Sequence, residues 1–326
     1  MEGPMTVPAP SSAAALDLDV AVSQSGWSLR EVLSRLSCVS GTFDRVADLP
    51  GGLTNRNFRV TGADFDLVVR VSPADDSPLP IDRQAEHRNS RLAAATGVGA
   101  QVLEYLPGEG IMAVSYIPGR TLTEDDIRGG AYAERIAAAC QRLHAGERFV
   151  NDFDMFVVQA DYLRIIQERG FAIPDDYLSF APAVERIRAA LAAHPVPTVP
   201  CNNDLLAGNM IDDGTSIRLI DYEYGGNNDP CFELGNIWSE SALDLEQLDR
   251  LVTAYYQGHQ PDKVARARLL GLMSKYGWTL WAAIQHASSD LDFDFWSWGM
   301  EKYERARQEF TRDGFDRLLD QAARRT

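Results

Sequence analysis

The sequence predicts a two-lobed α+β protein, in which an N-terminal lobe built on an antiparallel sheet precedes a mainly helical C-terminal lobe. Three observations lead to this prediction. Short runs rich in β-branched residues, separated by turns that contain glycine, occupy the chain between Phe43 and Ile117. Beyond Ile117, apolar residues recur at helical spacing. The 326 residues are also enough for two compact parts.

The N-terminal lobe is predicted to occupy residues 25–117. The preceding residues 1–24 are rich in Pro, Ala and Ser, a composition typical of a disordered leader. Ser28 and Glu31 form a capping-box pattern, which predicts a short helix to about Leu36. Strands are predicted over residues 43–49, 57–61, 65–71, 101–106 and 111–117, and a helix over 81–96.

The C-terminal lobe is predicted to occupy residues 118–326. Thr123 precedes three acidic residues, a pattern that caps a short helix. Longer helices are predicted over residues 131–144, 157–169, 177–193, 243–257, 261–286 and 295–310, and a last one from about residue 313.

Composition excludes several classes of function. The net charge of −16 argues against nucleic acids and anionic membranes as partners. No apolar run reaches the roughly 18 residues of a membrane-spanning helix, and residues 1–20 lack the pattern of a signal peptide. The cysteines are far apart in sequence, which predicts reduced thiols without a metal and a cytoplasmic location: Cys38, Cys140, Cys201 and Cys231.

The most informative stretch runs from residue 201 to residue 240. Asp204 and Asn209 are separated by four residues, and Asp221 follows a short apolar strand. Phosphoryl transfer needs one carboxylate that accepts the proton of a hydroxyl group and hard oxygen ligands for Mg²⁺. The spacing therefore predicts Asp204 as the catalytic base and Asn209 and Asp221 as metal ligands. The alternative is an acidic loop and a hairpin whose carboxylates are merely solvated.

The N-terminal lobe offers candidates for nucleotide binding. Gly51 and Gly52, in a turn between two strands, let backbone N–H groups approach an anion. Arg70 on a strand and Glu86 on the next helix match the ion pair with which kinases position a phosphate-binding cation. Backbone amides from Ser115 to Ile117 are placed to meet an adenine edge. The alternatives are a plain hairpin turn, a surface arginine and a solvated glutamate.

The C-terminal helices contain an aromatic cluster. Four of the six tryptophans lie between Trp278 and Trp298, and Trp278 and Trp281 share a helix face because they are three residues apart. Aromatic rings with a nearby carboxylate can hold a quaternary ammonium group, which donates no hydrogen bonds. The alternative is an aromatic core between helices.

With these motifs, the chain resembles the choline/ethanolamine kinase branch of the aminoglycoside-phosphotransferase-like kinases, from about Phe43 to Phe310. The resemblance rests on Asn203-Asp-Leu-Leu-Ala-Gly-Asn209, Leu219-Ile-Asp-Tyr-Glu-Tyr224 and Phe232-Glu-Leu-Gly-Asn-Ile-Trp-Ser-Glu240, which look like three sequence blocks of that family. Gly51-Gly-Leu-Thr-Asn-Arg-Asn57 resembles its phosphate loop.

The resemblance implies a protein-kinase-like fold, with a nucleotide-binding N-terminal lobe and a C-terminal lobe for catalysis and substrate binding. It implies ATP and Mg²⁺ as cofactors. Thr54 and Asn55 would join the ATP-binding residues, and Glu223 would lie near the metal. Glu240 would supply the anion beside a cationic substrate. The resemblance also implies which side chains form the aromatic walls: Trp278, Trp281, Trp298 and Tyr303.

One residue departs from the family pattern. The family usually has a histidine two residues before the base, and Asn202 stands there in this chain. That histidine holds the loop through hydrogen bonds and is not the base. Because an asparagine side chain both donates and accepts, we expect activity to be retained.

The sequence thus predicts a Mg²⁺-dependent kinase that transfers the γ-phosphoryl group of ATP to the hydroxyl of choline or a related amino alcohol, in the metabolism of phospholipid precursors. Ethanolamine, an aminoglycoside or thiamine are alternative substrates on the same fold. A catalytically silent binding protein is the alternative outside enzymes. A monomer or a homodimer is expected.

Overall fold

The computed structural model describes residues 17–23, 25–49, 52, 54–72, 78–79 and 81–324. The chain forms two compact units. The first comprises Met1–Ser77 and Ala100–Ile117, and the second comprises Pro78–Gly99 and Pro118–Thr326.

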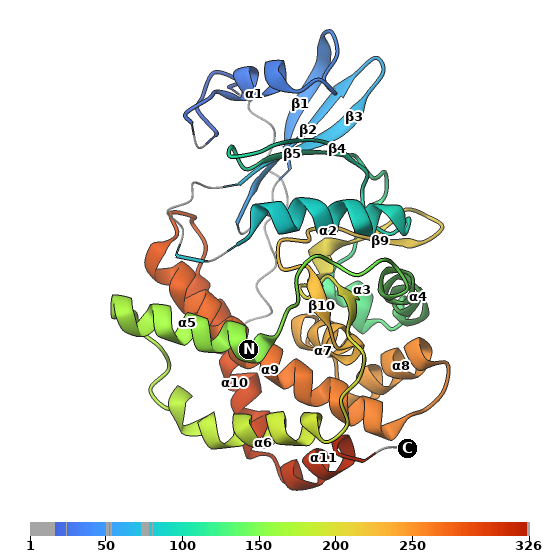
Figure 1. The fold of residues 1–326 in the computed structure, drawn as a ribbon, viewed down its shortest axis with the longest axis vertical. Coiled ribbons are helices and arrows are strands. Elements are labelled where there is room, and N and C mark those ends of the chain that lie inside the picture. The colour runs from blue at the N-terminus through green and yellow to red at the C-terminus, as the bar shows by residue number, and fades with distance from the viewer. Residues whose placement is uncertain are drawn as a thin grey trace. The chain divides into compact units, whose positions relative to one another are not determined.

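A five-stranded antiparallel sheet forms the first unit, with the strand order β1-β2-β3-β5-β4 (Figure 1). Alternate residues such as Phe58 and Val60, or Leu67 and Val69, are buried, as expected for strands with one face on a core. The predicted sheet is confirmed. Its strands are β1 (Phe43–Leu49), β2 (Arg56–Gly62), β3 (Asp66–Val71), β4 (Val102–Leu106) and β5 (Ile111–Ser115).

Helix α1 (Leu29–Arg35) packs on this core through Leu29, Val32 and Leu33. The predicted capping box is present, since the Ser28 hydroxyl accepts a hydrogen bond from the Glu31 N–H and the Glu31 carboxylate accepts one from the Ser28 N–H.

Residues 17–23 differ from the predicted disordered leader. Ala21 forms a β-bridge with Ser28, and the Val22 N–H donates to the Trp27 carbonyl over 2.8 Å. Leu18 and Val22 pack against the core of the sheet, so burial of these apolar side chains explains the order of this segment. Residues 1–16 and Gln24 lie outside the described part of the chain.

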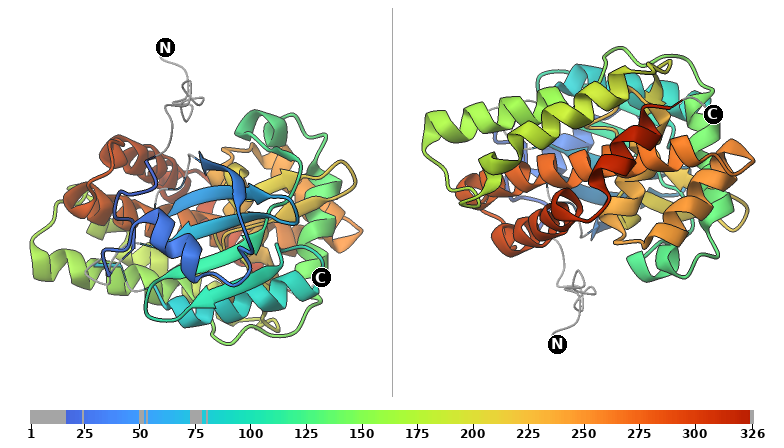
Figure 2. Two further views of the ribbon diagram at one scale, coloured as in Figure 1. Left: turned by 90° about the horizontal axis from the view of Figure 1, so that it is seen from above. Right: turned by 90° about the horizontal axis from the view of Figure 1, so that it is seen from below.

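The second unit is mainly helical and is built around α9 (Pro261–Ser288), which packs against α5, α7, α10 and α11 (Figure 1). Most of α9 is buried on all sides, as expected for a helix that is apolar around its whole circumference. Figure 2 shows α10 and α11, in red, lying against α9, in orange. The other long helices of this unit are α2 (Arg83–Ala95), α4 (Ala133–His144), α5 (Met155–Arg169), α6 (Ala181–Ala192), α7 (Pro230–Glu240), α8 (Leu245–Tyr256), α10 (Phe295–Thr311) and α11 (Phe315–Ala322).

Short elements position the loops between these helices. β7 (Val199–Cys201) pairs with β10 (Gly226–Asn228), and β8 (Met210–Asp212) pairs with β6 (Arg120–Thr121) and β9 (Ile217–Leu219). The sequence predicted only the strand that ends before Asp221. The remaining helical segments are α3 (Glu124–Arg128) and the 3₁₀ turns η1 (Tyr177–Phe180) and η2 (Ala207–Asn209).

Helix α2 belongs to the second unit, whereas the predicted boundary at residue 117 assigned it to the N-terminal lobe. The reason is a set of hydrogen bonds far apart in sequence. Asn89 donates to the Gly225 carbonyl over 2.9 Å and to the Asn151 side chain over 2.8 Å. After the helix, the Val98 carbonyl accepts from the Leu219 N–H at 3.1 Å.

Among the described residues, no helix combines the length and the apolar character that crossing a membrane would require.

Helices α7 and α9 approach closely at a pair of glycines. A Cβ atom at Gly235 would lie 2.1 Å from the Ala267 carbonyl oxygen, and one at Gly271 would lie 2.4 Å from the Gly235 carbonyl oxygen. We therefore predict that Gly235→Ala lowers the free energy of unfolding by about 2 kcal/mol, since overpacking forces the helices apart. Urea denaturation would measure this. Gly258→Ala is the control, because a Cβ there meets nothing within 4 Å. Equal changes in the two variants would contradict the prediction.

Candidate active site

The loop that carries Asp204 is held by side chains that accept hydrogen bonds from its backbone N–H groups. The two carboxylate oxygens of Glu233 accept from Asn202 and Asn203, each at 2.8 Å. Asn236 accepts from the Leu205 N–H at 2.7 Å. Glu233 and Asn236 share one face of α7 because they are three residues apart. The start of α7 thus supplies the acceptors that set the path of the loop.

Asn202 connects the Asp204 loop to the Asp221 loop. Its amide nitrogen donates to the carbonyls of Ile220 and Asp221, at 3.0 and 2.8 Å, and its amide oxygen accepts from the Asp204 N–H at 3.1 Å. The residue that departs from the family pattern therefore both donates and accepts within the loop, as its chemistry allows.

Two residues at the site have backbone conformations that non-glycine residues seldom adopt. Asn203 has a φ of 68° and Asp221 a φ of 63°, both in the left-handed region. The Asn203 side chain donates to the carbonyls of Tyr224 and Gly226 and accepts from Asn228. Such bonds stabilise a strained conformation, and strain of this kind clusters at functional sites.

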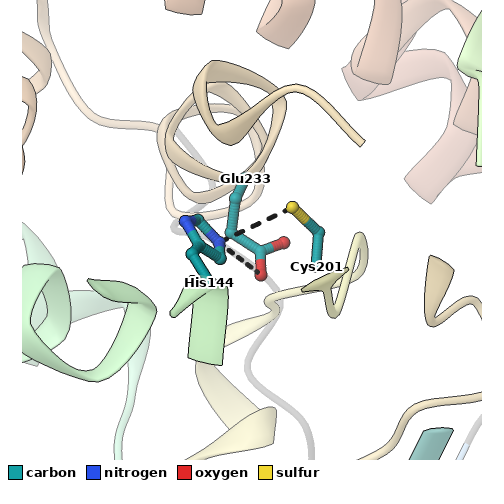
Figure 3. Close-up of side chains that lie close together, drawn as sticks. All are labelled: His144, Cys201 and Glu233. Atoms are coloured by element: carbon teal, nitrogen blue, oxygen red, sulfur yellow. Dashed lines mark hydrogen bonds and ion pairs between the residues drawn. The ribbon is translucent and has the colours of Figure 1, made fainter. Parts of the chain in front are cut away.

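Glu233 also belongs to a buried group with His144 and Cys201 (Figure 3). The His144 Nε2 atom lies 3.5 Å from the Cys201 sulfur and 3.6 Å from a Glu233 oxygen, and its Nδ1 atom lies 2.7 Å from the Tyr255 hydroxyl. Burial raises the pKa of the Cys201 thiol well above its usual range, and the charge of Glu233 raises it further. Both Glu233 oxygens accept hydrogen bonds from N–H groups of the Asp204 loop. The buried group of His144, Cys201 and Glu233 therefore supports this loop.

Negative charge is concentrated around Asp204. Burial raises the pKa of Asp204 well above the usual range of an aspartate, and the carboxylates of Glu240, Asp221 and Glu223 raise it further, while Lys302 lowers it. Carboxylates gathered in this way favour the binding of cations.

The candidate metal ligands are hard oxygen groups next to Asp204. The Asn209 amide nitrogen donates a hydrogen bond to the Asp204 carbonyl at 2.8 Å. Because the nitrogen is used in this way, the amide oxygen is the atom of Asn209 that can bind a metal. Asp221 lies two residues after the end of β9. An amide oxygen and a carboxylate suit Mg²⁺, so the donor set fits the predicted ion. Glu223 accepts a hydrogen bond from Arg83 at 3.1 Å.

Arg83 was not among the predicted site residues. It donates to Glu86 at 2.8 Å as well as to Glu223, and so connects α2 to the loop after β9. Glu86 is thus ion-paired within the second unit. Its predicted pairing with Arg70, which belongs to the first unit, stays a prediction.

The other predicted nucleotide-binding residues lie in the first unit. Gly51 lies outside the described residues, and a Cβ at Gly52 would meet the Asn55 carbonyl at 2.4 Å, so the turn requires glycine. Asn55 is buried, Thr54 is half-buried, and Arg70 is buried on β3 beside Met112 of β5.

One predicted hinge interaction is corrected by the structure. The Ser115 N–H donates to the Gln101 carbonyl at 2.8 Å, and the Tyr116 N–H donates to the Asp66 carbonyl at 3.1 Å. These two amides are used by the sheet and are not available to an adenine edge. Ile117, which follows them and is buried, stays a candidate.

Three of the predicted aromatic residues come together around Tyr224. The Trp281 indole N–H donates to the Tyr224 hydroxyl at 2.7 Å, and the Trp278 ring packs edge-on against the Tyr224 ring with 4.8 Å between centroids. The Trp298 ring lies 5.6 Å from that of Trp281. Helices α9 and α10 therefore join in one group of rings.

Tyr303 is not part of this group. Its hydroxyl donates to Asp176 at 2.6 Å, and its ring stacks near Tyr177 at 5.9 Å. Among the described residues, no ring contact connects it to Trp281 or Trp298. The reason is helical geometry, because Tyr303 follows Trp298 by five residues and therefore projects about 140° away from it around α10.

Lys302 is the main site residue that the sequence prediction missed. It is almost fully buried, its ammonium pairs with Glu240, and it lies 3.9 Å from the centroid of the Trp298 ring. A signal was present in the sequence, since Lys302 falls on the buried face of α10 with Phe295, Gly299 and Ala306. A charged residue on such a face requires a buried partner.

We predict that Glu233→Gln lowers the free energy of unfolding by about 1–3 kcal/mol. The amide offers one acceptor, so one loop N–H of Asn202 or Asn203 would face another donor. Urea denaturation would measure the change, and faster hydrogen exchange at both amides would locate it. Glu168→Gln, on the exposed face of α5, is the matched control. Unchanged stability and exchange in Glu233→Gln would contradict the role of this carboxylate.

Several known proteins are similar to this chain in sequence and fold. A probable ethanolamine kinase of Arabidopsis thaliana is 26% identical over an alignment of 300 residues that covers 81% of this chain and 79% of the relative. The crystal structure of a choline/ethanolamine kinase family protein of Mesorhizobium loti matches with a TM-score of 0.79 and 29% identity, over 90% of this chain and 99% of that one.

Two further structures share the fold. Choline kinase LicA of Streptococcus pneumoniae has a TM-score of 0.72 at 24% identity, over 86% of this chain and 97% of that one. The aminoglycoside phosphotransferase APH(4)-Ia, crystallised with AMP-PNP and hygromycin B, has a TM-score of 0.57 at 17% identity, over 85% of this chain and 96% of that one. The predicted two-lobed, kinase-like α+β fold is confirmed.

The family model for choline/ethanolamine kinase matches residues 46–260, which are more than half of the chain. The matched stretch contains the strands β2 to β5, the Asp204 loop and α7. The chain therefore belongs to the choline/ethanolamine kinase family and is a phosphotransferase that acts on an alcohol group.

Proposed function

We propose that this chain transfers the γ-phosphoryl group of ATP to the hydroxyl of choline or a related amino alcohol, with Mg²⁺ as the metal. The observation that carries the proposal is the environment of Asp204. Its loop is held by Glu233, its carboxylate lies in a field of negative charge, and Asn209 and Asp221 flank it with hard oxygen groups.

In the proposed step, the hydroxyl oxygen forms a bond to the γ-phosphorus while the bond from that phosphorus to the β–γ bridging oxygen breaks, releasing ADP. The hydroxyl proton passes to the Asp204 carboxylate. The raised pKa of Asp204 supports this role, because a more basic carboxylate accepts a proton more readily. Mg²⁺, which Asn209 and Asp221 would hold, supplies charge neutralisation on the phosphates.

The relatives support the choice of substrates. Their names include ethanolamine kinases and choline kinases, which supports an amino alcohol as acceptor. One LicA structure contains AMP and an aminoglycoside phosphotransferase contains AMP-PNP, which supports ATP as donor. The rings of Trp281 and Trp298 support a methylated ammonium as the cation of the substrate, because ring faces attract a cation that donates no hydrogen bonds.

A silent binding protein is the competing function, and the sequence feature that favours it is Asn202 in place of the family's histidine. The hydrogen bonds that Asn202 makes to both loops weaken this alternative, since they provide the loop support for which the family uses histidine.

We predict that Asp204→Asn lowers kcat by about 10²–10⁴-fold, because the amide cannot accept the hydroxyl proton. The affinity for Mg-ATP should change little, since the side chain keeps its shape. An ADP-release assay and calorimetric titration with Mg-ATP would measure both quantities. Asp161→Asn, an exposed position on α5, is the control. Near-normal turnover in Asp204→Asn would show that another group acts as the base.

We also predict that Trp281→Ala raises the KM for choline at least about tenfold while the KM for ATP changes much less, because the ring would contact the substrate and not the nucleotide. Steady-state kinetics with each substrate varied in turn would test this. Trp296→Ala is the matched control, since the Trp296 ring contacts His286 outside the Trp281 group. Equal effects on both KM values would assign Trp281 to packing alone.

A further inference from the structure

Arg83 carries a positive charge at a place where the helix itself disfavours one. It is the first residue of α2, and the N-terminal end of a helix has a partial positive charge. The Arg83 side chain is only 15% exposed, so water screens its charge poorly. A cation in such surroundings needs acidic partners, and the structure supplies two.

A single nitrogen of Arg83 donates to both partners. Its Nη1 atom lies 2.8 Å from the Oε2 atom of Glu86 and 3.1 Å from the Oε2 atom of Glu223. These two carboxylates are 4% and 6% exposed. Glu86 is three residues further along the same helix, a spacing that brings side chains together in any helix. Glu223 is 140 positions away in sequence, so only the tertiary structure brings it to Arg83.

The loop that carries Asp221 and Glu223 has backbone anchors of its own. Asn89, also on α2, donates to the Gly225 carbonyl over 2.9 Å. Asn202 donates to the Asp221 carbonyl over 2.8 Å. These amides hold the path of the loop, whereas Arg83 holds the side chain of Glu223. Loss of the guanidinium should therefore leave the loop in place and release one carboxylate.

Glu223 belongs to the group of acids around Asp204. Its charge and that of Asp221 raise the pKa of Asp204, so both are within electrostatic range of the proposed base. Asn209 contacts the Asp204 carbonyl from the same loop. Mg²⁺ demands near-octahedral geometry at short distances, so a carboxylate helps to hold it only where its orientation is fixed. Arg83 fixes that of Glu223 by binding its Oε2 atom.

We propose that Arg83 is a positioning residue for the Mg²⁺–nucleotide complex: it holds Glu223 in the orientation in which this carboxylate supports the metal beside Asn209 and Asp221. The inference rests on the proposed function and adds to it a residue that acts only through Glu223. Charge alone makes the opposite prediction, because a guanidinium repels a metal ion and its removal would tighten Mg²⁺ binding. The direction of the change therefore separates the two effects.

The test measures the Tm of the full-length protein at a fixed concentration of ADP while the Mg²⁺ concentration is raised. Arg83→Met should need about tenfold more Mg²⁺ for half of the rise in Tm, because partners that orient metal-binding groups contribute that much to affinity. The Tm shift caused by ADP without Mg²⁺ should stay unchanged. Arg88→Met, at an exposed position of α2, is the matched control and should match the wild type. An unchanged or lower Mg²⁺ requirement in Arg83→Met would overturn the inference.

Further variants separate positioning from folding. Arg83→Lys keeps a donating cation and should restore the Mg²⁺ requirement to within about threefold of the wild type. Glu223→Gln should raise the requirement by itself. Adding Arg83→Met to Glu223→Gln should change it by less than about twofold more, because Arg83 acts through Glu223. This double variant has no Glu223 charge to leave unpaired, so it serves even if Arg83→Met alone folds poorly. Independent, multiplying effects of the two substitutions would contradict the inference.

The Tm measurement needs no acceptor alcohol, so it is separate from the test of the proposed function. A wild type that responds to Mg²⁺ with ADP but phosphorylates neither choline nor a related amino alcohol would count against the proposed function alone. A wild type whose Tm does not respond to Mg²⁺ with ADP would overturn both. In the active enzyme, Arg83→Met should raise the Mg²⁺ requirement of turnover while the KM for choline stays within about twofold. A larger rise in the KM for choline than in the Mg²⁺ requirement would contradict a role at the metal.

Discussion

The rest of the site depends on the hydrogen bonds that the carboxylate of Glu233 accepts. Its two oxygens accept hydrogen bonds from the N–H groups of Asn202 and Asn203, the two residues immediately before Asp204. A buried carboxylate needs such donors, and a loop with consecutive inward N–H groups needs such an acceptor. His144 and Cys201 pack around the same carboxylate, so α4, α7 and β7 meet at the point that orients Asp204.

The site combines a well hydrogen-bonded loop with repulsion among buried carboxylates. Asp204 lies among the carboxylates of Glu240, Asp221 and Glu223, and its raised pKa reflects both burial and repulsion. Asn203 and Asp221 add left-handed backbone conformations. The fold remains stable despite this repulsion and backbone strain, because the surrounding residues form many hydrogen bonds and the helix α9 is almost fully buried. Bound cations would relieve the repulsion among these carboxylates.

Much of the fold could be predicted because local signals were strong. The capping boxes at Ser28 and Thr123 mark helix starts that the structure contains, and the periodic helices are present within a few residues. The short strands β7 and β10 were not predicted, because β7 contains Pro200 and β10 is Gly226-Asn-Asn228, residues that are rare in strands. The equally short β9 was predicted, because its residues are part of an apolar run. The assignment of α2 to the second unit depended on hydrogen bonds from Asn89 to Asn151 and to Gly225, which are 62 and 136 positions away in sequence.

The sequence by itself determined the elements and the chemical groups: the spacing of Asp204, Asn209 and Asp221, and the tryptophans of the last helices. Only the tertiary structure decided which groups meet. It separated Tyr303 from Trp298 and paired Lys302 with Glu240, which are 62 residues apart. The physical reason is that spacing along one helix or loop reports which residues share a face, whereas partners for buried charges come from other elements, and only packing brings these together.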